Sequence, residues 1–154
     1  MVYKINFMNY ISKYFKPEEL VGPEIYNKYT NKNDIYNLFD ENLLIIIDLI
    51  REWVKHPLIC NNWKIGGSRK ESGLRDINSN IGAKKSAHKL GKAVDLICKE
   101  LTSQEIHKII EENKDLLPCK IRIEKTSNGK PITWTHIDTN SNSNQIDKIY
   151  YFNA

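Results

Sequence analysis

The sequence predicts an α+β fold: a single domain, residues 1–154, in which helices pack on a small antiparallel sheet. Three observations support this prediction. Apolar residues in the first third recur at helical spacing, whereas short runs typical of strands dominate the last third. Helices followed by strands are typical of α+β proteins with an antiparallel sheet. No internal repeat and no linker rich in Pro, Gly or Ser divides the chain, whose 154 residues suit one domain.

Two helices are expected in the N-terminal part. Lys16–Leu20 starts a short helix, because Pro17 suits a first helical turn. A long helix is predicted over about Asp34 to Val54, since its apolar residues fall near 3.6 spacing. Either Asn33 or Asp34 is suited to cap that helix, and its apolar stripe is interpreted as part of the core.

Extended segments are expected after the long helix. Leu58–Cys60 and Trp63–Ile65 are predicted to be extended, because a glycine pair that indicates a turn follows them. Lys92–Cys98 has the pattern of a buried strand. Ala93 and Asp95 would then share one face of that strand.

The C-terminal third predicts one helix and a hairpin. Thr102–Glu105 fits a capping box that begins a helix with an apolar side. Ile121–Lys125 and Ile132–Thr139 are predicted strands, joined across the turn signal at Ser127–Pro131. Ile146–Phe152 could add a last strand.

The charge of the chain argues against a nucleic-acid partner. The net charge of +4 is mild and spread along the sequence, whereas nucleic-acid binding usually shows a clustered basic patch. The same charge favours approach to an anionic surface such as a cell wall. Lys84, Lys85 and Lys89 are interpreted as an exposed loop that could face such a polymer.

The N-terminal segment and the cysteines bear on the location of the protein. Lysines and tyrosines interrupt every apolar run of the first residues, so no signal-peptide core is recognised and we expect synthesis in the cytoplasm. The longest apolar run, Leu43–Ile47, is far shorter than a membrane span, so no membrane partner is expected. Cys60, Cys98 and Cys119 lack a paired spacing and are interpreted as free thiols of a reducing compartment.

Two histidines and one aspartate form a candidate metal-binding set. His88 and Asp95 are seven positions apart, and His136 lies on a separate predicted strand. Catalytic zinc typically takes three protein ligands and leaves a fourth position for water. The small side chain of Ala93 leaves room beside Asp95, and Gly91 permits a sharp turn that returns His88 toward it. Without further residues, unrelated surface or core positions explain these three side chains better than a metal site.

A longer pattern resembles a known peptidase family. Ser86-x-His88-x-x-Gly91-x-Ala93-x-Asp95 is similar to the zinc-binding signature of the D-alanyl-D-alanine carboxypeptidases and phage endolysin peptidases. That superfamily includes the lysostaphin-type endopeptidases and the hedgehog domain. Upstream, Ser72-Gly73-Leu74-Arg75 resembles the family segment that ends in arginine, and Trp134-x-His136 resembles the last ligand motif. The resemblance covers about residues 58–139 of a single peptidase-like domain.

The resemblance implies both the site and the activity. His88, Asp95 and His136 would bind one zinc ion, and Arg75 would contact the substrate or the transition state. The implied function is a zinc-dependent peptidase that hydrolyses peptidoglycan, as a D,D-carboxypeptidase or an endopeptidase. Its partner would be a stem peptide or a cross-link of peptidoglycan. The protein would be a monomer. It would act at the cell wall, either after release or as a virion component. By itself, Arg75 is better explained by an exposed salt bridge.

The general base departs from the family pattern. Many members carry a glutamate three residues before the last histidine, where this chain has Thr133, which cannot abstract a proton. Glu124 on the preceding strand is the first candidate for the base, and Asp138 is the alternative. The missing glutamate also supports a second hypothesis, a non-catalytic structural or wall-binding module with the same fold and metal.

The hairpin geometry decides whether Glu124 reaches the site. A two-residue turn at Asn128-Gly129 would set Glu124 opposite Thr133, about 10 Å along the sheet from His136. A wider loop would set Glu124 directly opposite His136. Pro131 cannot donate a ladder hydrogen bond, which favours the wider loop.

Three further residues have expected places. Trp63 and Trp134 are predicted to line a cleft, because aromatic side chains commonly form the walls of ligand sites. His107 falls on the polar side of its helix and is expected to be solvated.

Overall fold

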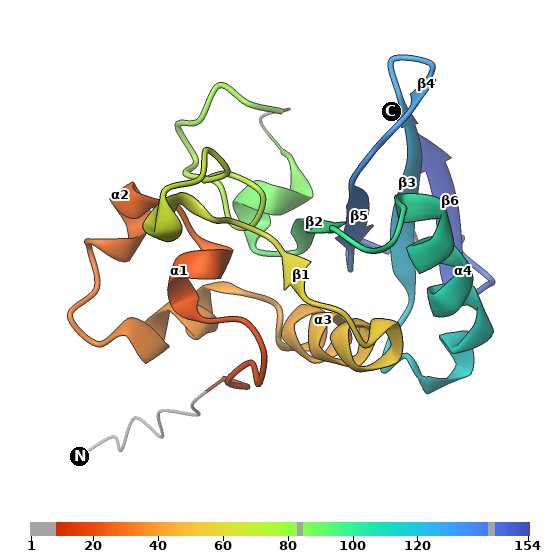
Figure 1. The fold of residues 1–154 in the computed structure, drawn as a ribbon, viewed down its shortest axis with the longest axis horizontal. Coiled ribbons are helices and arrows are strands. Elements are labelled where there is room, and N and C mark those ends of the chain that lie inside the picture. Colours follow the sequence, from red (N-terminus) through yellow and green to blue (C-terminus); the bar gives the residue numbers. More distant parts are fainter. Residues whose placement is uncertain (1–8, 83–84, 142–143) are drawn as a thin grey trace.

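The computed structural model describes residues 9–82, 85–141 and 144–154, and it has the predicted α+β architecture. In Figure 1 the N-terminal helices α1 and α2 lie on the left, and α3 lies below β1 and β2. The helices are α1 (Pro17–Leu20), α2 (Pro23–Tyr26), the 3-10 helix η1 (Lys32–Leu38), α3 (Glu41–Val54), α4 (Ser103–Glu112) and three further 3-10 helices, η2 (Trp63–Ile65), η3 (Ala87–Leu90) and η4 (Lys114–Leu116).

The sheet has the order β1-β2-β5-β3-β4, and β6 pairs with β3. All pairs are antiparallel except β3 with β6, which run parallel. The predicted small antiparallel sheet is therefore extended by one parallel strand. The strands are β1 (Leu58–Ile59), β2 (Ala93–Cys98), β3 (Ile121–Ser127), β4 (Lys130–Pro131), β5 (Thr135–Asp138) and β6 (Ile149–Asn153).

The two faces of the sheet have different environments. Val94 and Leu96 of β2, Ile123 of β3 and Ile137 of β5 are fully buried and share one hydrophobic cluster with α3 and α4. Because side chains alternate along a strand, Asp95 of β2, Glu124 of β3 and His136 of β5 point to the opposite side. The core therefore anchors one face of the sheet and leaves the other face to carry polar groups.

The predicted long helix is broken before Asp40, which corrects the expected span from Asp34 to Val54. Phe39 is extended, with ψ 152°, and Asp40 caps α3 by accepting a hydrogen bond from the Asn42 amide. The Asn9 side chain donates hydrogen bonds to the Tyr36 and Phe39 carbonyls. These tertiary contacts use backbone groups that a continuous helix would need, so neither Asn33 nor Asp34 caps α3.

Asp40 also ties this break to the polar face. Its amide donates to the Gly91 carbonyl at 2.9 Å, and its carboxylate accepts from the Thr139 hydroxyl at 2.7 Å. Gly91 precedes β2 and Thr139 follows β5. The start of α3 therefore fixes the loops at one end of both strands.

The segment around Trp63 also differs from the prediction. Trp63–Ile65 is a 3-10 helix rather than an extended segment. The Trp63 indole donates to the Val21 carbonyl at 2.8 Å and packs edge-on against Tyr26. Trp63 is therefore part of the contact with the N-terminal helices and does not line the pocket described below.

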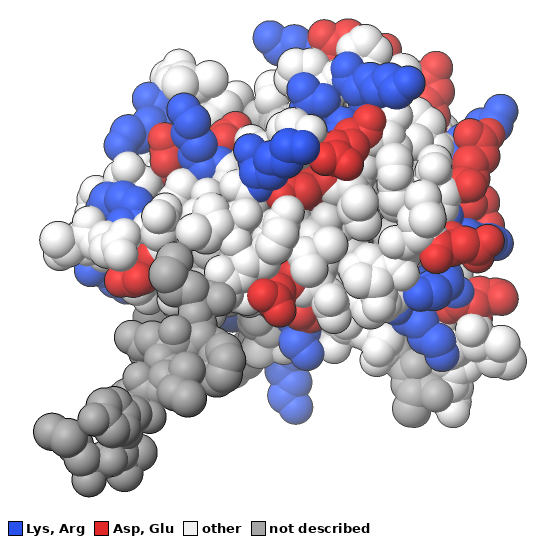
Figure 2. All heavy atoms as spheres, turned by 90° about the horizontal axis from the view of Figure 1, so that it is seen from below, with Lys and Arg blue, Asp and Glu red and all other residues white. Residues whose placement is uncertain are grey.

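No helix of the described residues is both long enough and apolar enough to cross a membrane. Figure 2 shows one face of the molecule, on which Lys and Arg side chains are interspersed with Asp and Glu side chains.

His107 is partly buried, which corrects its expected solvation. Its Nε2 atom is buried without a hydrogen-bond partner among the described residues, and its ring lies 6.3 Å from that of Tyr151. Burial, with a smaller contribution from Lys125, lowers the pKa of His107 from 6.5 to about 4. The helix periodicity placed His107 on the polar side, but the Tyr151 side chain of β6 lies against that side of α4.

Because the pKa of His107 is lowered in the folded state, we expect the protein to lose stability in mild acid. Neutral His107 is favoured in the folded state, so the unfolded chain binds the proton first as the pH falls from 6.5 to about 4. The stability is complete above pH 6.5 and is lost through that window. Allowing for the partial exposure of His107, we expect the free energy of unfolding to fall by roughly 1–2 kcal/mol across this pH window. Urea unfolding with metal chelated, compared with His107→Gln, measures it, and equal pH dependence in both proteins would contradict the prediction.

Candidate metal centre

Four side chains form a row across the polar face of the sheet. Asp95 on β2 pairs with His136 on β5, and Glu124 on β3 pairs with Phe152 on β6. The pairing of Ile123 with Ile137 between β3 and β5 places Glu124 beside His136. The row therefore runs Asp95, His136, Glu124, Phe152, on the face opposite the hydrophobic core.

His88 reaches the row from η3. The Ser86 hydroxyl accepts from the His88 amide at 3.3 Å and so supports this turn. Gly91 ends the turn with φ +67°, and a Cβ there would lie 2.0 Å from the Leu38 carbonyl oxygen, so only glycine fits. His88 Nδ1 lies 2.9 Å from the Gly73 carbonyl and donates to it, which leaves Nε2 facing Asp95.

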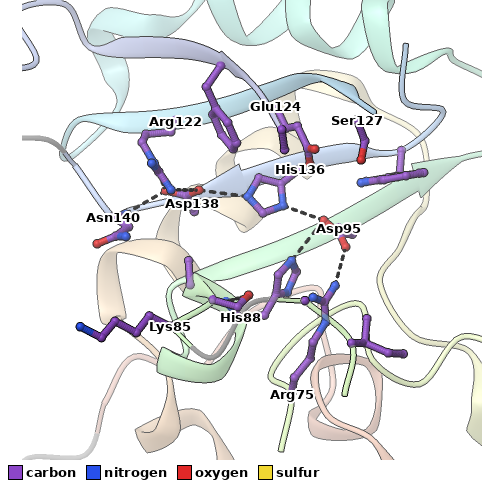
Figure 3. A pocket seen from close by; sticks show the side chains of 17 residues that line it. Arg75, Lys85, His88, Asp95, Arg122, Glu124, Ser127, His136, Asp138 and Asn140 are labelled. Atoms are coloured by element: carbon purple, nitrogen blue, oxygen red, sulfur yellow. Dashed lines mark hydrogen bonds and ion pairs between the residues drawn. The ribbon is translucent and has the colours of Figure 1, made fainter. Parts of the chain in front are cut away.

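The three predicted ligands come together in space (Figure 3). His136 Nδ1 lies 2.8 Å and His88 Nε2 lies 3.3 Å from the same Asp95 oxygen, Oδ1. One ligand atom from each residue falls within 4.8 Å of the others, and all three side chains are buried. The His88, Asp95 and His136 group could therefore hold a metal ion.

Arg75 holds the other oxygen of Asp95. Its Nη2 lies 3.3 Å from Asp95 Oδ2, and its Nε donates to the Glu71 carbonyl at 2.8 Å. The Arg75 side chain is 12% exposed, so it is not the exposed salt bridge that its residue type alone suggested. This contact turns Oδ1 of Asp95 toward the histidines.

The cluster favours positive charge at its centre. Burial alone would raise the pKa of Asp95, but hydrogen bonds from His136 and His88 outweigh it and hold that pKa well below its usual range. Burial alone would lower the pKa of His136, but hydrogen bonds to Asp138 and Asp95 raise it to about 9. A site that stabilises a cation between carboxylates suits a metal ion, which binds in competition with protons.

Asp138 orients His136 from the next row of the sheet. Its Oδ2 accepts from His136 Nε2 at 3.0 Å, so Nδ1 of His136 remains directed at Asp95. Arg122 donates to both oxygens of Asp138, at 2.8 and 3.0 Å, and the Asn140 amide donates to Oδ1 at 3.0 Å. With four donors on two oxygens and a side chain that is fully buried, Asp138 has no acceptor position left for a reacting proton.

We expect Asp138→Asn to weaken metal binding by about 10–100-fold, because the partner of a ligating histidine fixes its ring and its proton. An asparagine also cannot accept both Arg122 donors and the His136 proton together. Competition with a chromophoric chelator measures the affinity. Asp115→Asn, in the exposed η4, is the matched control. An unchanged affinity in folded Asp138→Asn would contradict this role.

The hairpin forms the tight turn, so the prediction of a wider loop is wrong. Asn128 and Gly129 have φ of 51° and 72°, and Ser127 pairs with Lys130 directly across them. Pro131 fits this turn because it pairs only at the short, exposed β4.

Glu124 nevertheless reaches His136, because the returning strand is irregular. The Ile132 amide donates to the Lys125 carbonyl, and the next paired residues are Ile123 and Ile137. Between these pairs, Glu124 alone lies opposite residues 133–136, so the returning strand carries extra residues in a bulge. The bulge shifts the register that the tight turn sets and moves Thr133 out of the row.

Glu124 has the environment of an acid–base group. Its residue is 8% exposed, and it makes no hydrogen bond or ion pair with the residues that the structure describes. Burial raises the pKa of its carboxyl, and the neighbouring His136 only partly opposes this effect. A raised pKa brings a glutamate closer to neutral pH, where proton transfer in both directions is efficient.

A pocket of about 420 Å³ opens over the cluster. His88, Asp95, His136, Glu124 and Arg75 all line it, and Trp134 lines it as predicted. The motifs did not reveal Arg122 and Phe152. Arg122 is two residues before Glu124 on the same strand, so the alternation of β3 could have placed it on this face. The parallel pairing of β6 that brings in Phe152 has no signal in the local sequence.

No protein-family model, no curated protein and no solved structure matched this chain in the three comparisons made.

Proposed function

We propose that this protein is a zinc-dependent peptidase that hydrolyses peptide bonds of bacterial peptidoglycan, as a D,D-carboxypeptidase or an endopeptidase. The observation that carries the proposal is the row itself, in which an unpaired Glu124 lies beside a His88, Asp95 and His136 cluster. The motif resemblance supports peptidoglycan as the substrate, with the cell wall as the place of action after release or from a virion.

The donor set fits zinc. Two imidazole nitrogens and one carboxylate oxygen are typical ligands of catalytic zinc, and they leave a position open. Ligand atoms around one tetrahedral zinc ion lie about 3.4 Å apart. The contacts of 2.8 and 3.3 Å between Asp95 and the two histidines are close to that spacing, and all ligand atoms of the cluster lie within 4.8 Å of one another. Gly73 and Asp138 hold the outer nitrogens of the two histidines, as such a site requires.

The proposed reaction divides the work among the pocket residues. A bound zinc ion supplies Lewis-acid polarisation and lowers the pKa of water toward neutrality. Glu124 accepts the proton of the attacking water and later delivers it to the leaving amine. Arg75 fixes Asp95 and lines the same pocket, so its remaining N–H groups are available to orient the substrate or stabilise the oxyanion.

Digestion of purified peptidoglycan tests the proposal. We expect the zinc-loaded protein to release soluble fragments that carry new peptide termini, identified by mass spectrometry. Chelation should stop the release, and added zinc should restore it. Bound zinc without any release from several peptidoglycan types would overturn the peptidase and leave the non-catalytic metal-binding module. Absence of metal binding would overturn both.

A further inference from the structure

The two ends of the pocket differ in their polar groups. Lys85, Arg122 and Asn140 lie at one end in Figure 3, and Ser127 lies at the other, with His88, Asp95 and His136 between them. We call the set of Lys85, Arg122 and Asn140 the basic end. The contrast suggests that the two halves of a bound peptide meet different chemistry.

The basic end has hydrogen-bond donors to spare. Arg122 uses Nε and Nη2 on Asp138, and its Nη1 makes no hydrogen bond with a described residue. Asn140 uses only its backbone amide, again on Asp138. The Lys85 ammonium group has neither a hydrogen bond nor an ion pair with the part of the chain that the structure describes. Lys89, by contrast, donates to the Ser79 carbonyl, and Lys84 lies outside the described residues.

The charge of the pocket also favours an anion. Three cationic side chains, Arg75, Lys85 and Arg122, and three acidic side chains, Asp95, Glu124 and Asp138, line it. Asp95 and Asp138 are each paired with an arginine, so they do not repel a ligand at full strength. A divalent metal ion adds two positive charges to this balance. An anionic group is therefore attracted to the pocket, and Lys85 is the cation without a partner of its own among the described lining residues.

We propose that the basic end is a subsite for a carboxylate of the substrate. Arg122 is already aligned by Asp138 and stacks over Phe152 at 4.7 Å, so its free edge is fixed in place before a ligand arrives. Asn140 and Lys85 complete the subsite from two other segments of the chain. The inference rests on the proposed peptidase function and defines its substrate class as acidic peptides, with the carboxylate on the Asp138 side of the metal cluster.

Two sources supply such a carboxylate: the C-terminus of the peptide, or an acidic residue within it. The test uses a synthetic peptidoglycan stem pentapeptide in four forms, with each of its C-terminal and glutamate carboxylates either free or amidated. Binding is measured by titration calorimetry on zinc-loaded Glu124→Gln, so that hydrolysis does not interfere. We expect amidation of one of the two carboxylates to weaken binding roughly tenfold, and that position identifies the source.

The variants locate the effect at the basic end. In the same Glu124→Gln background, Lys85→Ala and Asn140→Ala should each weaken binding of the free acid several-fold, about three- to tenfold, and leave the amide unchanged. Lys125→Ala removes the same charge from the opposite face of the sheet and should change neither. Equal binding of all four peptides, or equal losses for acid and amide, would overturn the subsite. If the wild-type protein does not hydrolyse the peptide but the free acid still binds more tightly than the amide, only the proposed peptidase function would be overturned.

Discussion

Replacing Glu124 with glutamine is expected to lower kcat for peptidoglycan hydrolysis by about 10²–10⁴-fold, the usual contribution of a general base. Glutamine has nearly the shape of glutamate, and no hydrogen bond of Glu124 to a described residue is lost. The His88, Asp95 and His136 cluster keeps all its contacts. We therefore expect unchanged zinc content and unchanged thermal stability, measured together with the rate of fragment release.

The matched control is Glu112→Gln, on the exposed side of α4, which should retain full activity. Full activity in Glu124→Gln would contradict the assignment of the base. Asp138 does not offer a substitute, because Arg122, Asn140 and His136 already occupy its oxygens. A loss of zinc together with activity would indicate instead that Glu124 supports the metal cluster.

The local sequence predicted that His88 and Asp95 come together, because their geometry depends on short-range constraints. Ser86 caps the His88 turn, Gly91 reverses the chain, and β2 projects Asp95 back toward it, all within one segment. The strand pattern placed His136 on a separate predicted strand. Only the pairing of β2 with β5 was needed to bring the halves together.

Most of the features that the sequence did not predict depend on contacts between residues distant in the chain. The helix break at Asp40 depends on Asn9, Gly91 and Thr139, none of which is a neighbour in sequence. The tight turn at Asn128-Gly129 followed its turn chemistry, and the bulge after it has no local signature. Glu124 reached its predicted neighbour through this bulge, by a different route from the one that the hairpin argument assumed.

Among these variants, Asp95→Asn is expected to lower the affinity for metal the most. Asp95 Oδ1 faces both histidines and Oδ2 faces Arg75, so one side chain connects every part of the cluster. Loss of the carboxylate charge removes a ligand outright. The metal affinity should therefore fall by more than the ~100-fold that loss of an outer partner costs. Chelator competition measures it, and hydrolysis should fall with it.

Thermal unfolding separates loss of metal from loss of fold in this variant. Added zinc stabilises a protein only as far as the native state binds it, so the melting temperature of wild type should rise with zinc concentration. The melting temperature of Asp95→Asn should not rise, whereas that of the control Asp115→Asn should follow wild type. Without metal, Asp95→Asn also leaves the Arg75 guanidinium without its carboxylate, and His136 loses one of the two carboxylates that raise its pKa. We therefore expect it to melt below wild type, and an equal zinc response in both would show that Asp95 is not a ligand.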